Sequence, residues 1–254
     1  MQEPKPDNRA RILEKSGIEI GGERHLIALA GNPNTGKSTL FNYLTGLRQH
    51  TGNWPGKTVA RAEGGYEYAG KKYKLVDLPG TYSLLSTSED EEIARNFILF
   101  GRPAVTLIVA DATRLERNLN LILQILEITD RAIVVLNLMD EAKRNRIEVD
   151  VERLSQRLRV PVVAVSARSG EGMTDLLDEV DRMVSAEEVP LPFRLPPLEG
   201  KEGDAIRQLS EQIRQLYPDL PNVSWIAMRL LDGDEEITNA LKYNSWLDPN
   251  DTDH

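Results

Sequence analysis

Eight consecutive residues have the types and spacing of a phosphate-binding loop. They read G-x-x-x-x-G-K-S and are Gly31, Asn32, Pro33, Asn34, Thr35, Gly36, Lys37 and Ser38, with Thr39 directly after them. In such a loop, backbone N–H groups surround the α- and β-phosphates of a nucleotide, the lysine reaches the β- and γ-phosphates, and the serine hydroxyl joins a Mg²⁺ shell. A strand-like apolar run at 26–30 precedes the loop and a helix-like stretch follows it, which favours this interpretation over an ordinary Gly/Asn turn.

A second group of candidate ligands, Asp77-Leu78-Pro79-Gly80, follows about forty residues later. Asp77 closes a predicted strand, where a carboxylate can hold Mg²⁺ through water, and the Gly80 amide can sense a γ-phosphate. Alone, Asp-x-x-Gly is more often a turn, but its position after a phosphate loop favours the site. Between the two groups, Thr58 is the natural candidate for a second hydroxyl ligand of Mg²⁺, and Thr51 competes with it.

A third group has the chemistry to recognise a base. Asn137-Leu138-Met139-Asp140 follows a predicted strand, and a carboxylate at Asp140 can accept from both N1–H and the 2-amino group of guanine, which adenine does not offer. The alternative is a loop that caps the next helix. Ser166, Ala167 and Arg168 follow another strand and would back the guanine ring. Together the three groups predict GTP binding and hydrolysis with Mg²⁺.

Strands that alternate with helices must position these groups. The alternation from 105 to 184 implies right-handed βαβ crossovers, and the hairpin at 62–77 adds an antiparallel edge. We expect an α/β fold of the Ras-like phosphate-loop GTPase type, with a mainly parallel six-stranded sheet, one antiparallel edge strand and a small C-terminal helical domain. Two segments, 47–60 and 78–92, are predicted to be mobile loops.

The chain divides by composition. The predicted units are an N-terminal arm with a short helical patch, a G domain, a connector with four prolines, a helical domain and a tail, at 1–24, 25–186, 187–203, 204–245 and 246–254. Helices are expected at 204–217, 223–231 and 235–241.

Charge and composition exclude several function classes. The 254 residues include 40 acidic and 31 basic side chains, for a net charge of −9, so no nucleic acid partner is expected. The chain has no cysteine, which rules out disulfides and thiolate ligands, and its three histidines are scattered, which argues against a transition-metal site. The apolar runs are too short to span a membrane and the N-terminus is polar, so we expect a cytoplasmic location.

Four stretches together resemble the cytosolic G domain of the bacterial ferrous iron transporter B: 31–42, the Asn-Trp-Pro-Gly loop at 52–59, 77–84 and 137–140. The resemblance covers about 25–185. It implies that Thr58, rather than Thr51, binds Mg²⁺. It also implies that Asn34, with backbone carbonyls around Gly52 and Trp54, holds a K⁺ ion that stimulates hydrolysis.

Two departures from common GTPase patterns bear on rate and affinity. Thr81 stands where many GTPases carry a water-orienting glutamine, so intrinsic turnover should be slow, with Asn34, Lys37, Thr58 and Gly80 as the predicted catalytic set. Leu138 stands where many G domains have a lysine that packs over the base. That replacement predicts weak nucleotide affinity and fast GDP release.

The resemblance implies a GTPase switch that regulates ferrous iron uptake at the inner face of the bacterial cell membrane. Its partner would be a membrane-embedded permease region of the same chain or of a partner chain, and a homo-oligomer is compatible with the sequence. Two alternatives remain. One is a nucleotide-gated binding module whose hydrolysis is incidental. The other is a ribosome-associated GTPase, disfavoured by the acidic balance and by the lack of a Gly-x-x-Gly clamp.

Overall fold

The computed structural model describes residues 13, 17–18, 24–47, 49–85, 88–218, 220 and 222–243. Nearly all of the predicted arm, including its helical patch apart from Leu13, and the whole of the predicted tail lie outside these residues.

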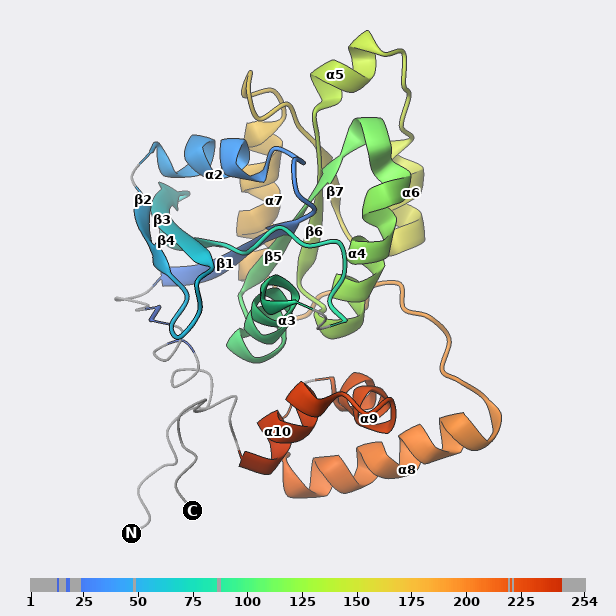
Figure 1. Cartoon of the computed structure of the whole chain (residues 1–254). Coiled ribbons are helices and arrows are strands. Elements are labelled where there is room, and N and C mark those ends of the chain that lie inside the picture. Colours follow the sequence, from blue (N-terminus) through green and yellow to red (C-terminus); the bar gives the residue numbers. More distant parts are fainter. Residues whose placement is uncertain are drawn as a thin grey trace.

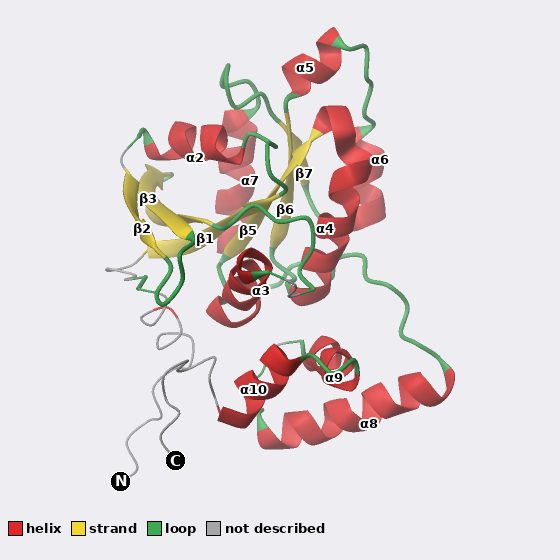
Figure 2. Cartoon of the chain, in the orientation of Figure 1, coloured by secondary structure: helices red, strands yellow, loops and turns green. Residues whose placement is uncertain are grey.

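A seven-stranded sheet, in the order β2-β3-β4-β1-β5-β6-β7, forms the centre of the fold (Figures 1 and 2). The strands from β4 to β7 are parallel, whereas β3 runs antiparallel to both of its neighbours. The predicted fold class is confirmed. The strands are β1 Arg24–Gly31, β2 Gln49–Asn53, β3 Ala60–Tyr68, β4 Lys71–Asp77, β5 Val105–Asp111, β6 Ala132–Asn137 and β7 Val162–Ala164.

The seventh strand corrects the expected count of six. It is β2, which lies within 47–60, where the sequence predicted only a mobile loop. Every residue of β2 is exposed, so no apolar alternation marks it. Its order comes from backbone pairing with β3, a tertiary interaction that a local pattern does not encode.

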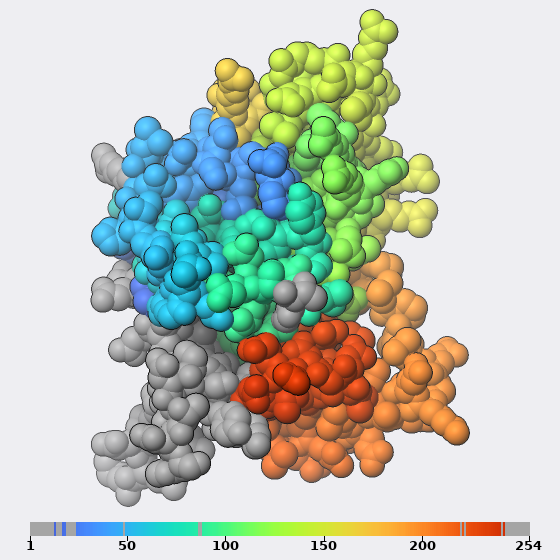
Figure 3. Space-filling model, in the orientation of Figure 1, coloured from blue at the N-terminus to red at the C-terminus, as the bar shows by residue number. Residues whose placement is uncertain are grey.

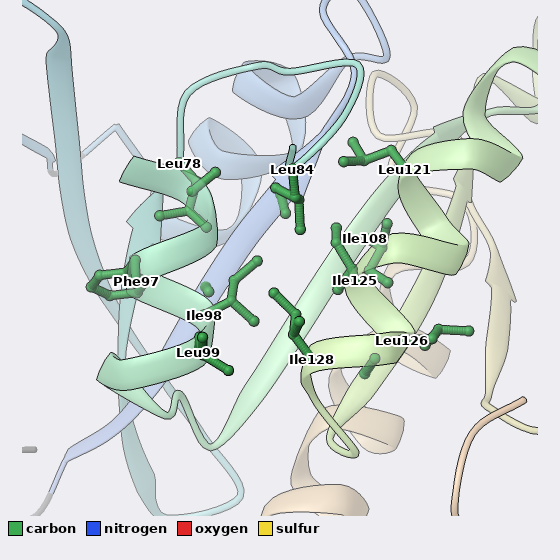
Figure 4. Close-up of a cluster of buried hydrophobic side chains, with 14 of the residues drawn as sticks. Leu78, Leu84, Phe97, Ile98, Leu99, Ile108, Leu121, Ile125, Leu126 and Ile128 are labelled. Carbon is green, nitrogen blue, oxygen red and sulfur yellow. The ribbon is translucent and has the colours of Figure 1, made fainter. Parts of the chain in front are cut away.

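Alternate residues of β1 build the two cores. Ile27 and Leu29 pack with apolar side chains of α2 and α7, whereas Ala28 and Ala30 join the cluster of α3, α4 and α6. Figure 4 shows Ile98 of α3 and Ile125 of α4 pointing toward each other over Ile108 of β5. The helices of this part are α2 Lys37–Thr45, α3 Glu89–Gly101, α4 Leu115–Ile128, α5 Met139–Arg144, α6 Val151–Leu158 and α7 Met173–Ser185, with the short 3₁₀ helix η1 Ala112–Arg114.

Helix α3 begins inside the second segment that was predicted to be a mobile loop. The Ser88 side chain caps it by accepting from the Glu91 amide, and four acidic residues fill its first turn. The Ser-x-x-Glu spacing is a capping-box signal that was present in the sequence.

Three further helices, α8 Gly200–Leu216, α9 Val223–Leu231 and α10 Glu235–Tyr243, lie below the sheet in Figure 1. Helix α8 starts at Gly200, three residues before the predicted end of the proline-rich connector at 203. Apolar side chains from all three helices, among them Ile213, Ile226 and Ile237, belong to the same buried cluster as α3 and α4. Figure 3 shows the red surface of α9 and α10 adjoining the green surface above it.

Candidate nucleotide site

The loop between β1 and α2 is held in a narrow space. Asn34 and Gly36 have positive φ angles of 65° and 81°. A Cβ atom on Gly36 would lie 2.3 Å from Asn137 Nδ2, and one on Gly31 would lie 2.5 Å from the Val109 carbonyl oxygen. Glycine is therefore required at both positions of the motif.

The start of α2 has no side-chain cap, so its first N–H groups have no side-chain acceptor. Such a helix end attracts anions. Ser38 and Thr39 lie in this first turn and are exposed, as is Asn34, while Pro33 is half-buried.

A buried asparagine joins the phosphate loop to the predicted base segment. Asn137 Nδ2 donates to the Thr35 carbonyl oxygen at 2.9 Å, and its Oδ1 accepts from the Ala167 amide at 3.0 Å. Within the loop, Thr35 Oγ1 donates to the Asn32 carbonyl oxygen at 3.0 Å. Since Asn137 is only 1% exposed, these bonds have little competition from water, and they fix the two segments relative to each other.

Lys37 Nζ lies 2.6 Å from Asp77 Oδ1 and 2.6 Å from the Leu78 carbonyl oxygen. Burial raises the pKa of Asp77, and the nearby Lys37 ammonium opposes that shift only in part. The residue expected to reach phosphate and the residue expected to serve Mg²⁺ are therefore bonded to each other in this conformation.

The segment after Asp77 crosses the phosphate loop. The Leu78 amide donates to the Leu29 carbonyl oxygen at 2.9 Å, and the Thr81 amide donates to that of Gly31 at 3.4 Å. A Cβ atom on Gly80 would lie 3.3 Å from the Pro33 nitrogen. The structure therefore brings Lys37, Asp77 and Gly80 together around the loop, as the sequence predicted.

The predicted base segment is also assembled. The buried Ser166 hydroxyl accepts from the Asp140 amide at 3.1 Å. The Asp140 carboxylate, 37% exposed, accepts from the Arg144 guanidinium at 3.1 Å, while Arg168 is exposed. Arg144 was missed in the sequence, although its i,i+4 spacing from Asp140 on a helix was a usable signal.

The loop between β2 and β3, which was predicted to complete the Mg²⁺ and K⁺ sites, packs against α3 instead of the phosphate loop. Register places Asp77 opposite Ala62 and Ala62 opposite Thr51, so the β2–β3 loop projects from the sheet edge where Asp77 lies. The Trp54 ring, however, is buried against Phe97 of α3 at a centroid distance of 5.6 Å.

Backbone groups of this loop are bonded within it. Gly52 pairs with Arg61 in the β2–β3 ladder, and the Trp54 carbonyl oxygen accepts from the Lys57 amide at 3.0 Å. Thr58 is exposed. Within the described part of the chain, no bond joins Gly52, Trp54 or Thr58 to the phosphate loop.

A glycine-dependent loop that opens a helix at the carboxyl edge of a mainly parallel sheet, locked to a separate base segment, makes this a phosphate-loop nucleotide-binding domain of the G-domain class. Residues 25–180 match the family model described as Ferrous iron transport protein B, and the chain belongs to that family. None of the helices among the described residues is long and apolar enough to cross a membrane.

The sequences and structures of known relatives support the same family assignment. The Fe(2+) transporter FeoB of Salmonella choleraesuis (strain SC-B67) is 43% identical over 212 residues, which are 82% of this chain but only 27% of that relative. The chain thus spans about a quarter of the length of the curated relatives it matches. The cytosolic domain of the T. maritima FeoB iron transporter in apo form is 36% identical, with a TM-score of 0.78 over 86% of each chain. That of L. pneumophila FeoB is 31% identical, with a TM-score of 0.76 over 87% of each chain.

Proposed function

We propose that the chain binds GTP with Mg²⁺ and hydrolyses it slowly to GDP and phosphate. The observation that carries this proposal is the pair of hydrogen bonds made by the Asn137 side chain. They hold the phosphate loop and the base segment in a fixed relative position. A loop that served phosphate alone would not need that connection. Crystal forms of the T. maritima domain with GDP and with GMPPNP support the proposal.

Oxygen ligands suited to Mg²⁺ lie beside the phosphate loop. Ser38 is exposed in the first turn of α2, and Asp77 is held at its side by Lys37. Hydroxyl and carboxylate oxygens are the donors that Mg²⁺ prefers. Thr58 would join them after its loop moves. The ion would neutralise charge on the β- and γ-phosphates.

Base recognition is assigned to Asp140, with Ser166, Ala167 and Arg168 beside the ring. The Ser166 hydroxyl orients the Asp140 backbone, so the carboxylate is held by α5 while remaining accessible. Arg144 competes with guanine for this carboxylate. Since an exposed i,i+4 pair contributes only about 0.3–0.5 kcal/mol, guanine can displace it.

Nucleotide binding should switch the segment after Asp77. A polyphosphate would draw Lys37 from Asp77 and from the Leu78 carbonyl, which frees the carboxylate for Mg²⁺ and removes one anchor of the segment. The Gly80 amide would then donate a hydrogen bond to the γ-phosphate, when that phosphate is present. Thr81 is buried and offers no long side chain to orient water, which supports slow turnover.

Potassium stimulation requires a second rearrangement. Asn34 is exposed at the loop, but the Trp54 carbonyl is used by Lys57 and Gly52 lies in the β2–β3 ladder. We assign K⁺ to Asn34 with the carbonyls of Gly52 and Trp54 in a conformation in which this loop has left α3. The bound ion would supply positive charge near the phosphates, as an arginine finger does.

This switch would regulate ferrous iron passage through a membrane-embedded permease region of the same chain or of a partner chain, in line with the name Fe(2+) transporter FeoB of a relative of which the shared region covers 27%. The G domain at 25–186 would carry the nucleotide, and α8–α10 would form the helical domain that follows it.

Steady-state hydrolysis with GTP and ATP, each in K⁺ and in Na⁺, tests these assignments. We expect GTP to be strongly preferred and K⁺ to accelerate its hydrolysis. Equal rates with GTP and ATP would refute the base assignment, whereas equal rates in K⁺ and Na⁺ would refute only the ion assignment.

A second candidate is a nucleotide-gated binding module whose hydrolysis is incidental. It is favoured by the Lys37–Asp77 bond, because nucleotide binding alone would break that bond. In this case Thr58→Ala and Asn34→Ala, which should stop hydrolysis, would leave regulation of iron uptake intact in the full-length transporter. Loss of regulation in both variants would reject this candidate.

A further inference from the structure

A pocket of about 650 Å³ lies where η1, the start of α4, the 145–150 loop and the start of α6 meet, and none of its lining residues is a predicted nucleotide-site residue. Its interior is aliphatic and includes Leu115, Ile147, Val149 and Leu154. Four exposed arginines, Arg114, Arg117, Arg153 and Arg157, surround this interior. The volume falls within the range of ordinary ligand-binding pockets.

Among the residues that the structure describes, the guanidinium groups of these four arginines have no bonded hydrogen-bond acceptor and no ion-pair partner. Other exposed arginines of the described residues divide into two groups: Arg144 and Arg182 pair with carboxylates, whereas Arg146 and Arg168 do not, so it is the gathering of four such arginines at one pocket that sets this site apart.

Their placement is also unfavourable for the isolated domain. Arg117 and Arg153 lie in the first turns of α4 and α6, next to the positive ends of the helix dipoles. Neighbouring cations at such positions repel each other and the helix ends. Glu116 and Glu152 in the same first turns offset part of this repulsion, but the four guanidinium groups without bonded acceptors still favour a negatively charged partner.

We propose that this pocket docks an acidic peptide segment of a partner, with one large apolar side chain in the aliphatic interior and flanking carboxylates on the four arginines. Guanidinium groups bind carboxylates in bidentate geometry, and a buried apolar anchor supplies the affinity that exposed ion pairs lack.

Two features of the lining favour a peptide over other anions. No aromatic side chain lines the pocket, and its apolar residues are few and lie among seven charged ones, whereas membrane-surface sites present a broad apolar face with aromatic residues. Glu116, Glu148 and Asp150 also line the pocket, and a free polyphosphate has no N–H groups to donate to these carboxylates. A peptide can place its amides against these carboxylates and its own carboxylates against the arginines.

Selection of a random twelve-residue peptide display library on the whole chain tests the proposal. We expect enrichment of sequences with Asp or Glu on both sides of a Leu, Ile or Phe. The selected peptides should bind at least about tenfold more weakly to the variant R114Q/R117Q/R153Q/R157Q and to Ile147→Asp, because the first removes the charges and the second the apolar contact. The control R24Q/R182Q/R207Q/R214Q changes the net charge equally and should keep the affinity within about twofold.

Thermal unfolding establishes that each variant is folded. No enrichment of acidic peptides, or equal affinity for the pocket variant and the parent chain, would overturn the proposal. Binding to phosphatidylserine vesicles that is lost in the pocket variant, without peptide enrichment, would assign the surface to lipid instead and would also overturn it.

Discussion

Lys37 Nζ and Asp77 Oδ1 lie 2.6 Å apart, so the two charges that a nucleotide and its metal ion would separate are joined in this conformation. Both side chains are largely buried, at 11% and 17% exposure, and the Leu78 carbonyl shares the ammonium. The pair keeps the phosphate loop and the segment after β4 in contact, and nucleotide binding must replace it.

Asp77→Asn should lower Mg²⁺-dependent GTP hydrolysis at least about tenfold, which corresponds to about 1.4 kcal/mol in the barrier, because an amide holds the metal-bound water less well than a carboxylate. Binding of GDP without Mg²⁺ should not weaken and should tighten modestly, because the asparagine competes less well than the carboxylate for Lys37. Single-turnover hydrolysis and GDP titration measure the two effects. Asp204→Asn, on the exposed surface of α8, is the matched control, and an unchanged rate in Asp77→Asn would remove Asp77 from the metal site.

Asp77 also gives the nucleotide-free protein a pH-dependent stability. Burial raises its pKa in the folded state, and Lys37 only partly opposes the shift, so the unfolded chain releases this proton at lower pH. The stabilising contribution of the protonated group is present below the ordinary pKa and is lost as pH rises through the raised pKa. In urea unfolding at several pH values, the free energy of unfolding of the parent chain should fall relative to that of Asp77→Asn as pH rises from the ordinary pKa of an aspartate through the raised one. The same slope in both proteins would contradict this assignment.

Asp140→Asn should exchange an acceptor for a donor and shift preference from guanine to xanthine nucleotides by at least about tenfold. Competition between GTP and XTP for a labelled nucleotide measures the shift. Arg144→Ala should instead raise GTP affinity about twofold, because it removes a competitor for the carboxylate. Parent-like selectivity in Asp140→Asn would mean that another residue reads the base.

Much of the nucleotide site follows from the sequence because its parts are carried by short motifs at strand ends. Parallel strands deliver their carboxyl ends to one edge, and β1, β4 and β6 accordingly bring Lys37, Asp77 and Asn137 together, as the order of the motifs along the chain led us to expect. The second role of Asn137 was not predicted, since its bonds to Thr35 and Ala167 depend on tertiary packing.

The loop between β2 and β3 shows why other parts could not be predicted. Its residues carry no apolar period, and Trp54 is fixed by a contact with Phe97, more than 40 positions later in the chain. Lys57 adds a hydrogen bond to Glu92 of the same helix. Burial alone would lower the pKa of Lys57, but the bond and charge of Glu92 outweigh it and raise the pKa. The local sequence predicted a mobile loop here, and that prediction missed the ordered structure because contacts with residues far away in the chain determine the position of this segment.

Asn137→Ala should destabilise the fold by about 1–3 kcal/mol, because it leaves the buried Thr35 carbonyl and Ala167 amide without partners. It should also weaken GTP binding, since the phosphate and base segments would no longer be held together. Asn137→Asp is the sharper variant: it keeps the volume and the acceptor for Ala167 but places a carboxylate oxygen against the Thr35 carbonyl. Urea unfolding and nucleotide titration measure both. Full nucleotide affinity in both variants would refute the view that Asn137 couples the two segments.

Arg95 and Asp234 form a buried ion pair, 3.1 Å apart, that joins α3 to the residue before α10, and Arg229 shares the Asp234 carboxylate. Arg95→Met should therefore cost about 3–5 kcal/mol of unfolding free energy, because it leaves Asp234 buried without its α3 partner, whereas the double variant Arg95→Met/Asp234→Leu should recover much of that loss.

Burial alone would raise the pKa of Asp234, but the Ile237 amide, Arg95 and Arg229 outweigh it and lower the pKa below its ordinary value. The parent chain should accordingly lose this stabilisation as pH falls from the ordinary pKa through the lowered one, and the double variant should not. Urea unfolding at several pH values tests both statements, and additive losses from Arg95→Met and Asp234→Leu would show that the two side chains do not interact across this contact.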